Sequence, residues 1–194
     1  MTYKKTTAVI FEKPGLLEVR EASLRAPAAN ECLIESDWSG ISTGTERLML
    51  TGEMPPFPGL GYPLIPGYET VGKVVESPEG SELRPGTYVF APGSVGFTDA
   101  KNLFGGSARH IICPEDRLIP LPEKLGSEGV LLALAATALH ALRRCEQAGP
   151  PELIVGHGVL GQLLARLTRI IHGCLLYTSP SPRDYAASRM PSSA

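Results

Sequence analysis

Three glycines near the C-terminal end of the sequence have a spacing that suits a phosphate-binding turn. The six residues of this G-x-G-x-x-G pattern are Gly156, His157, Gly158, Val159, Leu160 and Gly161. A short apolar stretch precedes the pattern and an amphipathic segment follows it, which is the context of a dinucleotide-binding loop. The glycines allow a tight turn and a close approach to a pyrophosphate, whose charge faces the free N–H groups of the following helix. We therefore predict a dinucleotide site here, with His157 as a variable position, although a glycine-rich turn without a ligand is the alternative.

Two groups of polar side chains are candidates for moving a proton. They are Ser42, Thr43, Thr45 and Glu46 in one segment and Tyr68 and Glu69 in another. Hydroxyl groups can relay a proton and carboxylates can accept one. Two structural alternatives stay open. Thr45 and Glu46 would satisfy backbone N–H groups in a capped turn, and Tyr68 would be a buried, hydrogen-bonded phenol.

The first two-thirds of the chain consist of short β-rich segments with Gly and Pro between them. These segments are residues 7–11, 16–20, 32–38, 70–76, 87–91 and 108–113. Their length and punctuation favour a small, irregular barrel. Residues 54–67 contain five prolines and cannot form a helix.

The character of the sequence changes after Pro122. Ser127 is a plausible N-cap for a helix that continues to about Cys145. An Ala-Gly-Pro-Pro-Glu break follows, then a predicted strand at 153–155 and the glycine pattern. The next segment places its apolar side chains on one helical face, namely Leu160, Leu163, Leu164, Leu167 and Ile171. We expect a barrel, a linking helix and the opening of a β-α-β unit.

Residues 174–194 do not continue that unit. A second apolar strand is expected there, but the sequence turns to Ser/Pro-rich segments. It resembles the in-frame translation of a sequencing adapter, with a short index between two fixed arms. We expect this tail to be foreign and disordered, which would make the native part, 1–173, an N-terminal fragment.

The composition is that of a soluble globular protein. The chain has 194 residues, is 43% hydrophobic and carries a net charge of −2. It has no basic patch, so no nucleic-acid partner is expected, and its longest apolar run is too short to span a membrane. The four cysteines are scattered and the N-terminus lacks a signal peptide, so we expect free thiols in the cytoplasm.

Several motifs resemble the medium-chain dehydrogenase/reductase superfamily. Gly40-Ile41 with its polar cluster is similar to a Gly-Ile-Cys segment, and Gly67-Tyr68-Glu69 to a Gly-His-Glu segment. The resemblance implies a mainly β GroES-like barrel followed by the truncated start of an α/β Rossmann domain. It places the GroES-like domain at 1–126, a linking helix at 127–149 and the Rossmann start at 150–173. It also implies that Thr137 packs near the nicotinamide, and that any homo-oligomer forms through the missing Rossmann residues.

The same resemblance indicates a zinc-less member. Zinc members bind the metal through Cys, His and Cys or Asp, where this sequence has Ser42, Tyr68 and Ala133. A hydroxyl, a phenol and a methyl group do not supply the thiolate and imidazole donors that catalytic zinc prefers. Residues 93–106 contain no cysteine for a structural zinc. We therefore predict no metal.

Within the superfamily, residues 39–47 and the proline-rich residues 51–69 resemble the bacteriochlorophyllide dehydrogenase family. That family oxidises a hydroxyethyl group of the pigment to acetyl and passes hydride to NAD. NADP is not excluded, because the residue that would discriminate falls in the tail. Phe57 and Tyr62 would contact the flat pigment ring, or else the loop that carries them only closes the barrel.

Two other functions remain open at this stage. One is a zinc-less alcohol or quinone oxidoreductase with a different substrate. The other is a GroES-like binding module without catalysis, which the glycine pattern argues against. On either enzymatic reading, we expect the truncated chain itself to be inactive.

Overall fold

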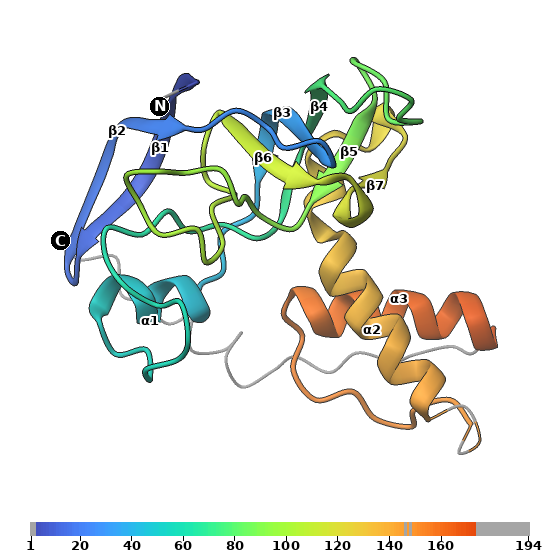
Figure 1. Cartoon of the computed structure of the whole chain (residues 1–194). Coiled ribbons are helices and arrows are strands. Elements are labelled where there is room, and N and C mark those ends of the chain that lie inside the picture. The colour runs from blue at the N-terminus through green and yellow to red at the C-terminus, as the bar shows by residue number, and fades with distance from the viewer. Residues whose placement is uncertain (1–2, 146, 148, 174–194) are drawn as a thin grey trace, which may run out of the picture. The chain divides into compact units, whose positions relative to one another are not determined.

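The computed structural model describes residues 3–145, 147 and 149–173. The chain divides into two compact units, with the boundary between Leu132 and Ala133. Figure 1 shows that strands dominate the first unit and helices the second. The predicted tail, 174–194, lies outside the described residues.

The first unit contains two antiparallel sheets. In the first, β1 (Lys4–Lys13) pairs with β2 (Leu16–Leu24) as a hairpin. The second has the order β6-β3-β4-β5-β7. Its strands are β3 (Glu31–Ser39), β4 (Thr70–Glu76), β5 (Tyr88–Ala91), β6 (His110–Pro114) and β7 (Ile119–Pro120). All six strands predicted for this unit are present, and the mainly β fold class is confirmed.

Alternating burial along the strands builds one main core. Ala8 and Ile10 of β1 face it, while Thr7, which precedes them, is exposed, as the two-residue period of a strand requires. Isolated bridges from Ala8 to Ala108 and from Leu24 to Phe97 connect the hairpin to the rest of the barrel. The core side chains with no exposed surface include Ile10, Leu24, Leu33, Ile34, Val89, Ile111 and Ile112.

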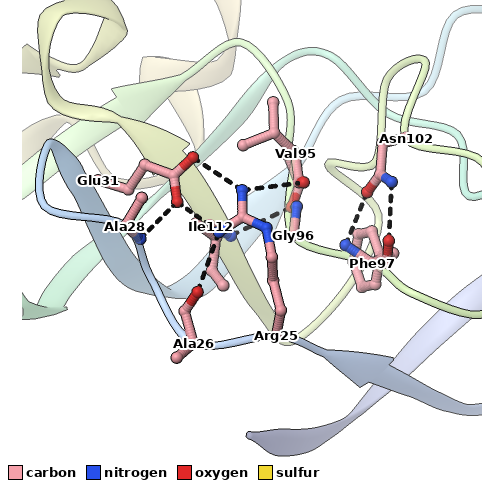
Figure 2. A network of polar contacts seen from close by, with 10 residues as sticks. Arg25, Ala26, Ala28, Glu31, Val95, Gly96, Phe97, Asn102 and Ile112 are labelled. Carbon is pink, nitrogen blue, oxygen red and sulfur yellow. Dashed lines mark hydrogen bonds and ion pairs between the residues drawn. The ribbon is translucent and has the colours of Figure 1, made fainter. Parts of the chain in front are cut away.

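Residues 92–106 contain no helix or regular strand and are held by polar contacts (Figure 2). The side-chain amide of Asn102 accepts the N–H of Phe97 at 2.7 Å and donates to its carbonyl at 2.8 Å. The guanidinium of Arg25 donates to both carboxylate oxygens of Glu31, at 2.6 and 2.8 Å, and to the carbonyl of Val95 at 3.3 Å. These side-chain contacts give the segment a defined path across the barrel.

The helix that follows the barrel begins differently from the prediction. A 3-10 segment, η2 (Glu123–Leu131), starts after Pro122, and α2 (Leu132–Arg144) continues from it. Ser127 lies inside η2, so its prediction as an N-cap was wrong. Proline already initiates the turn at 122, and Gly126 (φ 49°, ψ −129°) interrupts the helical backbone just before Ser127.

By length and composition alone, the stretch Glu123–Arg144 is apolar enough to cross a membrane, and it is the one such stretch among the described residues. Its regular part, α2, has only 13 residues, whereas a spanning helix needs about 20. The 3-10 part packs against strands β3, β4 and β5. Both observations are typical of a helix attached to a barrel.

The predicted strand at 153–155 was also wrong. These residues are irregular, and the side chains of Leu153 and Val155 are 77% and 87% exposed. A strand needs a hydrogen-bonded neighbour, and the described part of the second unit contains none. The helix after the glycine pattern is present as α3 (Val159–His172). On its predicted apolar face Leu163, Leu164 and Leu167 are half-buried, whereas Leu160 and Ile171 remain exposed.

Candidate active site

The first polar segment connects the end of β3 to helix α1 (Thr45–Thr51). The hydroxyl oxygen of Ser42 accepts the N–H of Thr45 at 3.3 Å, which satisfies a free donor at the start of α1. Thr45 is half-buried and Thr43 is exposed. The capping group of this turn is therefore Ser42, and Thr45 provides the N–H that is capped.

Glu46, in the first turn of α1, is buried and accepts two backbone N–H groups. One belongs to Ser42 and the other to Gly67, so a single carboxylate joins the two polar segments. Burial raises the pKa of Glu46, the two hydrogen bonds oppose that rise, and the charge of Glu69 adds to it. These contacts agree with the structural alternative for Glu46, in which its carboxylate satisfies backbone N–H groups.

The second polar segment lies against residues 104–107. The N–H of Gly106 donates to the carbonyl of Gly67 at 2.7 Å. Gly67 has a φ of 92°, and a Cβ there would collide with the backbone of Ser107. Glycine is required at 67 for both reasons, and the turn that it forms sets the direction of Tyr68 and Glu69.

Tyr68 is half-buried, and its ring lies beside that of Phe104, with centroids 5.0 Å apart and planes at 51°. Edge-tilted pairs of this kind are favourable for aromatic rings. No sequence motif marks Phe104, because it lies 36 positions beyond Tyr68 in an irregular segment. The contact gives Tyr68 an aromatic neighbour from outside both polar segments.

Glu69 follows directly and has a mostly buried side chain, 8% exposed. Its backbone carbonyl accepts the N–H of Gly40 at 2.7 Å, which brings the two polar segments together a second time. Burial raises the pKa of Glu69. Ser42, Glu46, Tyr68 and Glu69 therefore come from two segments that Glu46 and the Gly40 hydrogen bond hold side by side.

The proline-rich loop has a structural use for one of its two predicted pigment contacts. The hydroxyl of Tyr62 donates to the carbonyl of Met49 in α1, and its ring packs on a small core of Phe11, Met49 and Leu64. Phe57 is half-buried, and its carbonyl accepts the N–H of Leu60 at 3.1 Å. The contacts of Tyr62 favour the role of closing the barrel.

The glycine pattern forms a tight turn at the start of α3. Gly156 has a φ of 93°, and a Cβ at Gly161 would overlap the carbonyl oxygen of Gly156. Gly158 is the N-cap of α3 and has open space around its Cα, while His157, Val159 and Leu160 are exposed. Side-chain-free backbone at a helix N-terminus is the arrangement that a pyrophosphate requires, so these residues fit a dinucleotide.

Thr137 lies on an exposed face of α2, where its hydroxyl donates to the carbonyl of Ala133 at 3.0 Å. It belongs to the second unit, together with the glycine pattern. Among the described residues, no group of three or more His, Cys, Asp or Glu side chains is arranged to hold a metal ion.

Comparisons with known proteins agree with this architecture. Residues 28–123 match the family model of the alcohol dehydrogenase GroES-like domain. An alcohol dehydrogenase from Escherichia coli CFT073, in complex with NADH, has a TM-score of 0.69 at 20% identity over 87% of this chain and 54% of its own. The D-arabinose dehydrogenase of Sulfolobus solfataricus has a TM-score of 0.72 at 17% identity over 88% of this chain and 58% of its own. These likenesses show the fold.

Two curated relatives are much more similar in sequence. The 2-desacetyl-2-hydroxyethyl bacteriochlorophyllide A dehydrogenase of Cereibacter sphaeroides is 51% identical over 84% of this chain and 53% of its own length. Its counterpart in Rhodobacter capsulatus is 48% identical over 84% of this chain and 52% of its own length. The chain thus spans about half the length of these relatives. On these matches the chain belongs to the medium-chain dehydrogenase/reductase superfamily, as a relative of the bacteriochlorophyllide dehydrogenases.

Proposed function

We propose that this chain is the N-terminal part of a cytoplasmic dehydrogenase of bacteriochlorophyll biosynthesis. Its reaction is the oxidation of the 3-hydroxyethyl group of a bacteriochlorophyllide to 3-acetyl, with NAD as hydride acceptor. The observation that carries the proposal is the identity of 51% and 48% to two enzymes named for this substrate. No metal takes part in the proposed reaction.

The glycine pattern is the proposed site of the cofactor pyrophosphate. Gly156 provides the turn, Gly158 leaves room beside the backbone and Gly161 allows close packing within the loop. When bound, the nicotinamide accepts the hydride. The chain's own residues must then take the hydroxyl proton, and the carboxyl and hydroxyl groups of the candidate active site are the groups available for it.

A chimera tests the function. Residues 1–173 of this chain are joined to the remaining C-terminal half of the Cereibacter sphaeroides relative, and the product is incubated with NAD and 3-hydroxyethyl bacteriochlorophyllide. We expect NADH and the 3-acetyl pigment to form in equal amounts, with the intact relative as positive control. Turnover of small alcohols or quinones without turnover of the pigment would favour a different oxidoreductase. A folded chimera that does not bind NAD would favour a binding module.

A further inference from the structure

The two buried glutamates of the candidate active site have opposite hydrogen-bonding situations. Glu46 is 5% exposed, and its carboxylate accepts the N–H groups of Ser42 and Gly67. These donors belong to the two segments that form the site. Two backbone donors stabilise the ionised form of the carboxylate that they bind, and the carboxylate in turn fixes the backbone around it.

Glu69 is buried to nearly the same extent, but its carboxylate has no hydrogen-bond donor among the described residues. Its exposed fraction is 8%, and burial alone accounts for its raised pKa. One of its oxygens points to the Cα of Gly40, where a Cβ would be 2.7 Å from Oε2. The buried side-chain polar atoms without a partner among the described residues are Ser36 Oγ and His110 Nδ1, so the unpaired oxygens of Glu69 keep contact with solvent. A carboxylate that is unpaired and open to solvent beside the polar cluster is free to take a proton.

We infer that Glu69 is the proton-accepting carboxyl group of the site, and that Glu46 is a positioning residue that holds the two polar segments together. The inference rests on the proposed function for the identity of the substrate whose proton is taken. The division of roles between Glu69 and Glu46 rests on the different hydrogen bonding of their two side chains.

The proton transfer balances as follows. The O–H bond of the substrate breaks and its proton bonds to an oxygen of Glu69. The electron pair left on the substrate oxygen forms the C=O bond as hydride leaves the carbon for the proposed cofactor. The neutral carboxyl group then returns the proton to water. Glu69 can do this because its oxygens are not occupied by other donors of the described residues.

Neighbouring charge supports the same assignment. Among the described residues, the electrostatic coupling at Glu69 involves Glu46 of α1, whose pKa the charge of Glu69 helps to raise. Phe104 and the glycines near the pair have no ionisable side chain. A carboxyl group whose pKa is raised by burial, beside a second carboxylate that backbone donors hold, suits a base that must exchange protons near neutral pH.

Thermal unfolding of the present chain as a function of pH tests the division of roles without any turnover. Because burial raises the pKa of Glu69, this carboxyl group keeps its proton to a higher pH in the native chain than in the unfolded chain. The stability that this provides is present at low pH and lost as pH rises through the native pKa. Glu69→Gln should remove that loss, so the variant gains in melting temperature over the wild type as pH rises to neutral. Glu46→Gln places an NH₂ group against a backbone N–H and should lower the melting temperature at every pH. Because the pKa of Glu46 is raised as well, this loss should be smaller at neutral pH than in acid, but it should not turn into a gain.

Kinetics of the chimera completes the test. We expect Glu69→Gln to lower kcat by about 100-fold or more and to abolish the acid limb of the pH–rate profile. Glu46→Gln should keep that limb where the protein folds. If Glu69→Gln destabilises the chain at every pH, or leaves the acid limb in place, the inference is overturned. If the wild-type chimera is inactive while the melting profiles follow the expectation, the failure lies in the proposed function and not in the assignment of Glu69 as the proton-holding group.

Discussion

Gly40 and Glu69 lie in contact at the junction of the two polar segments. The N–H of Gly40 donates to the carbonyl of Glu69 at 2.7 Å, and a Cβ at position 40 would lie 2.7 Å from Oε2 and 3.1 Å from Cβ of Glu69. Glycine is present here because the carboxylate fills the space where a side chain would be.

Replacement of Gly40 by alanine should therefore displace the Glu69 carboxylate. The added methyl group has to move that side chain, and overpacking of this kind costs about 1–3 kcal/mol. Gly44→Ala is the matched control, because Gly44 has backbone angles in the right-handed region and a methyl group added there would meet nothing within 4 Å. Denaturant unfolding measures both variants. Equal free energies of unfolding for the two would show that the contact at Gly40 has no energetic weight.

The strands of the first unit could be predicted because their sequences carry the information locally. Thr6, Ala8 and Ile10 form one face of β1 and are buried together, and a two-residue period of this kind indicates which face is buried whatever the strand pairs with. The glycine turn before α3 was also predicted from its own residues. The failed strand at 153–155 shows the limit, since an apolar run becomes a strand only when a neighbour supplies hydrogen bonds.

The candidate active site depends on contacts that no local pattern contains. Glu46 bonds to Gly67, 21 positions later, and Tyr68 packs on Phe104 from an irregular segment. The residue types were recognisable as proton carriers, but their partners decide their roles. The sequence could therefore name Glu46 and Glu69 as candidates, whereas the hydrogen bonds separate them.

Asn102 should be a main stabilising residue of segment 92–106. Its amide makes two hydrogen bonds to the backbone of Phe97, in a segment without regular structure. Asn102→Ala leaves both backbone groups without their partner and should lower the free energy of unfolding by about 1–3 kcal/mol. The exposed neighbour Lys101 provides a control, since Lys101→Ala should change the free energy of unfolding by less than about 0.5 kcal/mol. A loss at Asn102 no larger than at Lys101 would contradict this role.

The Arg25–Glu31 pair should make stability depend on acid pH. The guanidinium of Arg25 lowers the pKa of Glu31, against the effect of burial. A carboxyl with a lowered native pKa contributes stability above its unfolded value, which is about 4.3, and the contribution is lost as pH falls through the native pKa. Arg25→Gln should therefore reduce stability at neutral pH and reduce it less in acid. Melting curves from neutral to acid pH test this, and parallel curves for the two proteins would argue against it.

The glycine pattern offers a pair of substitutions with different expected effects. Alanine at Gly161 would overlap the carbonyl oxygen of Gly156, whereas alanine at Gly158 meets no atom within 4 Å. Gly161→Ala should loosen the turn and speed amide exchange in the first turn of α3, while Gly158→Ala should leave exchange unchanged. In the chimera, both variants should bind NAD more weakly in calorimetric titration, because Gly158→Ala fills the space meant for the pyrophosphate. Normal NAD affinity of Gly158→Ala would place the cofactor elsewhere.

Chelation tests whether the proposed reaction needs a metal. Ser42 accepts the N–H of Thr45, and Tyr68 packs on Phe104. Catalytic zinc is bound by thiolates, imidazoles and carboxylates, and neither of these two side chains is one of those donors. The proposed proton acceptor, Glu69, is a carboxyl group of the protein. Turnover of the chimera should therefore be unchanged after prolonged dialysis against a strong chelator, while a zinc-dependent alcohol dehydrogenase treated in parallel loses its activity. If the chimera loses turnover and regains it on addition of one equivalent of zinc, a metal and not a carboxyl group would acidify the substrate hydroxyl.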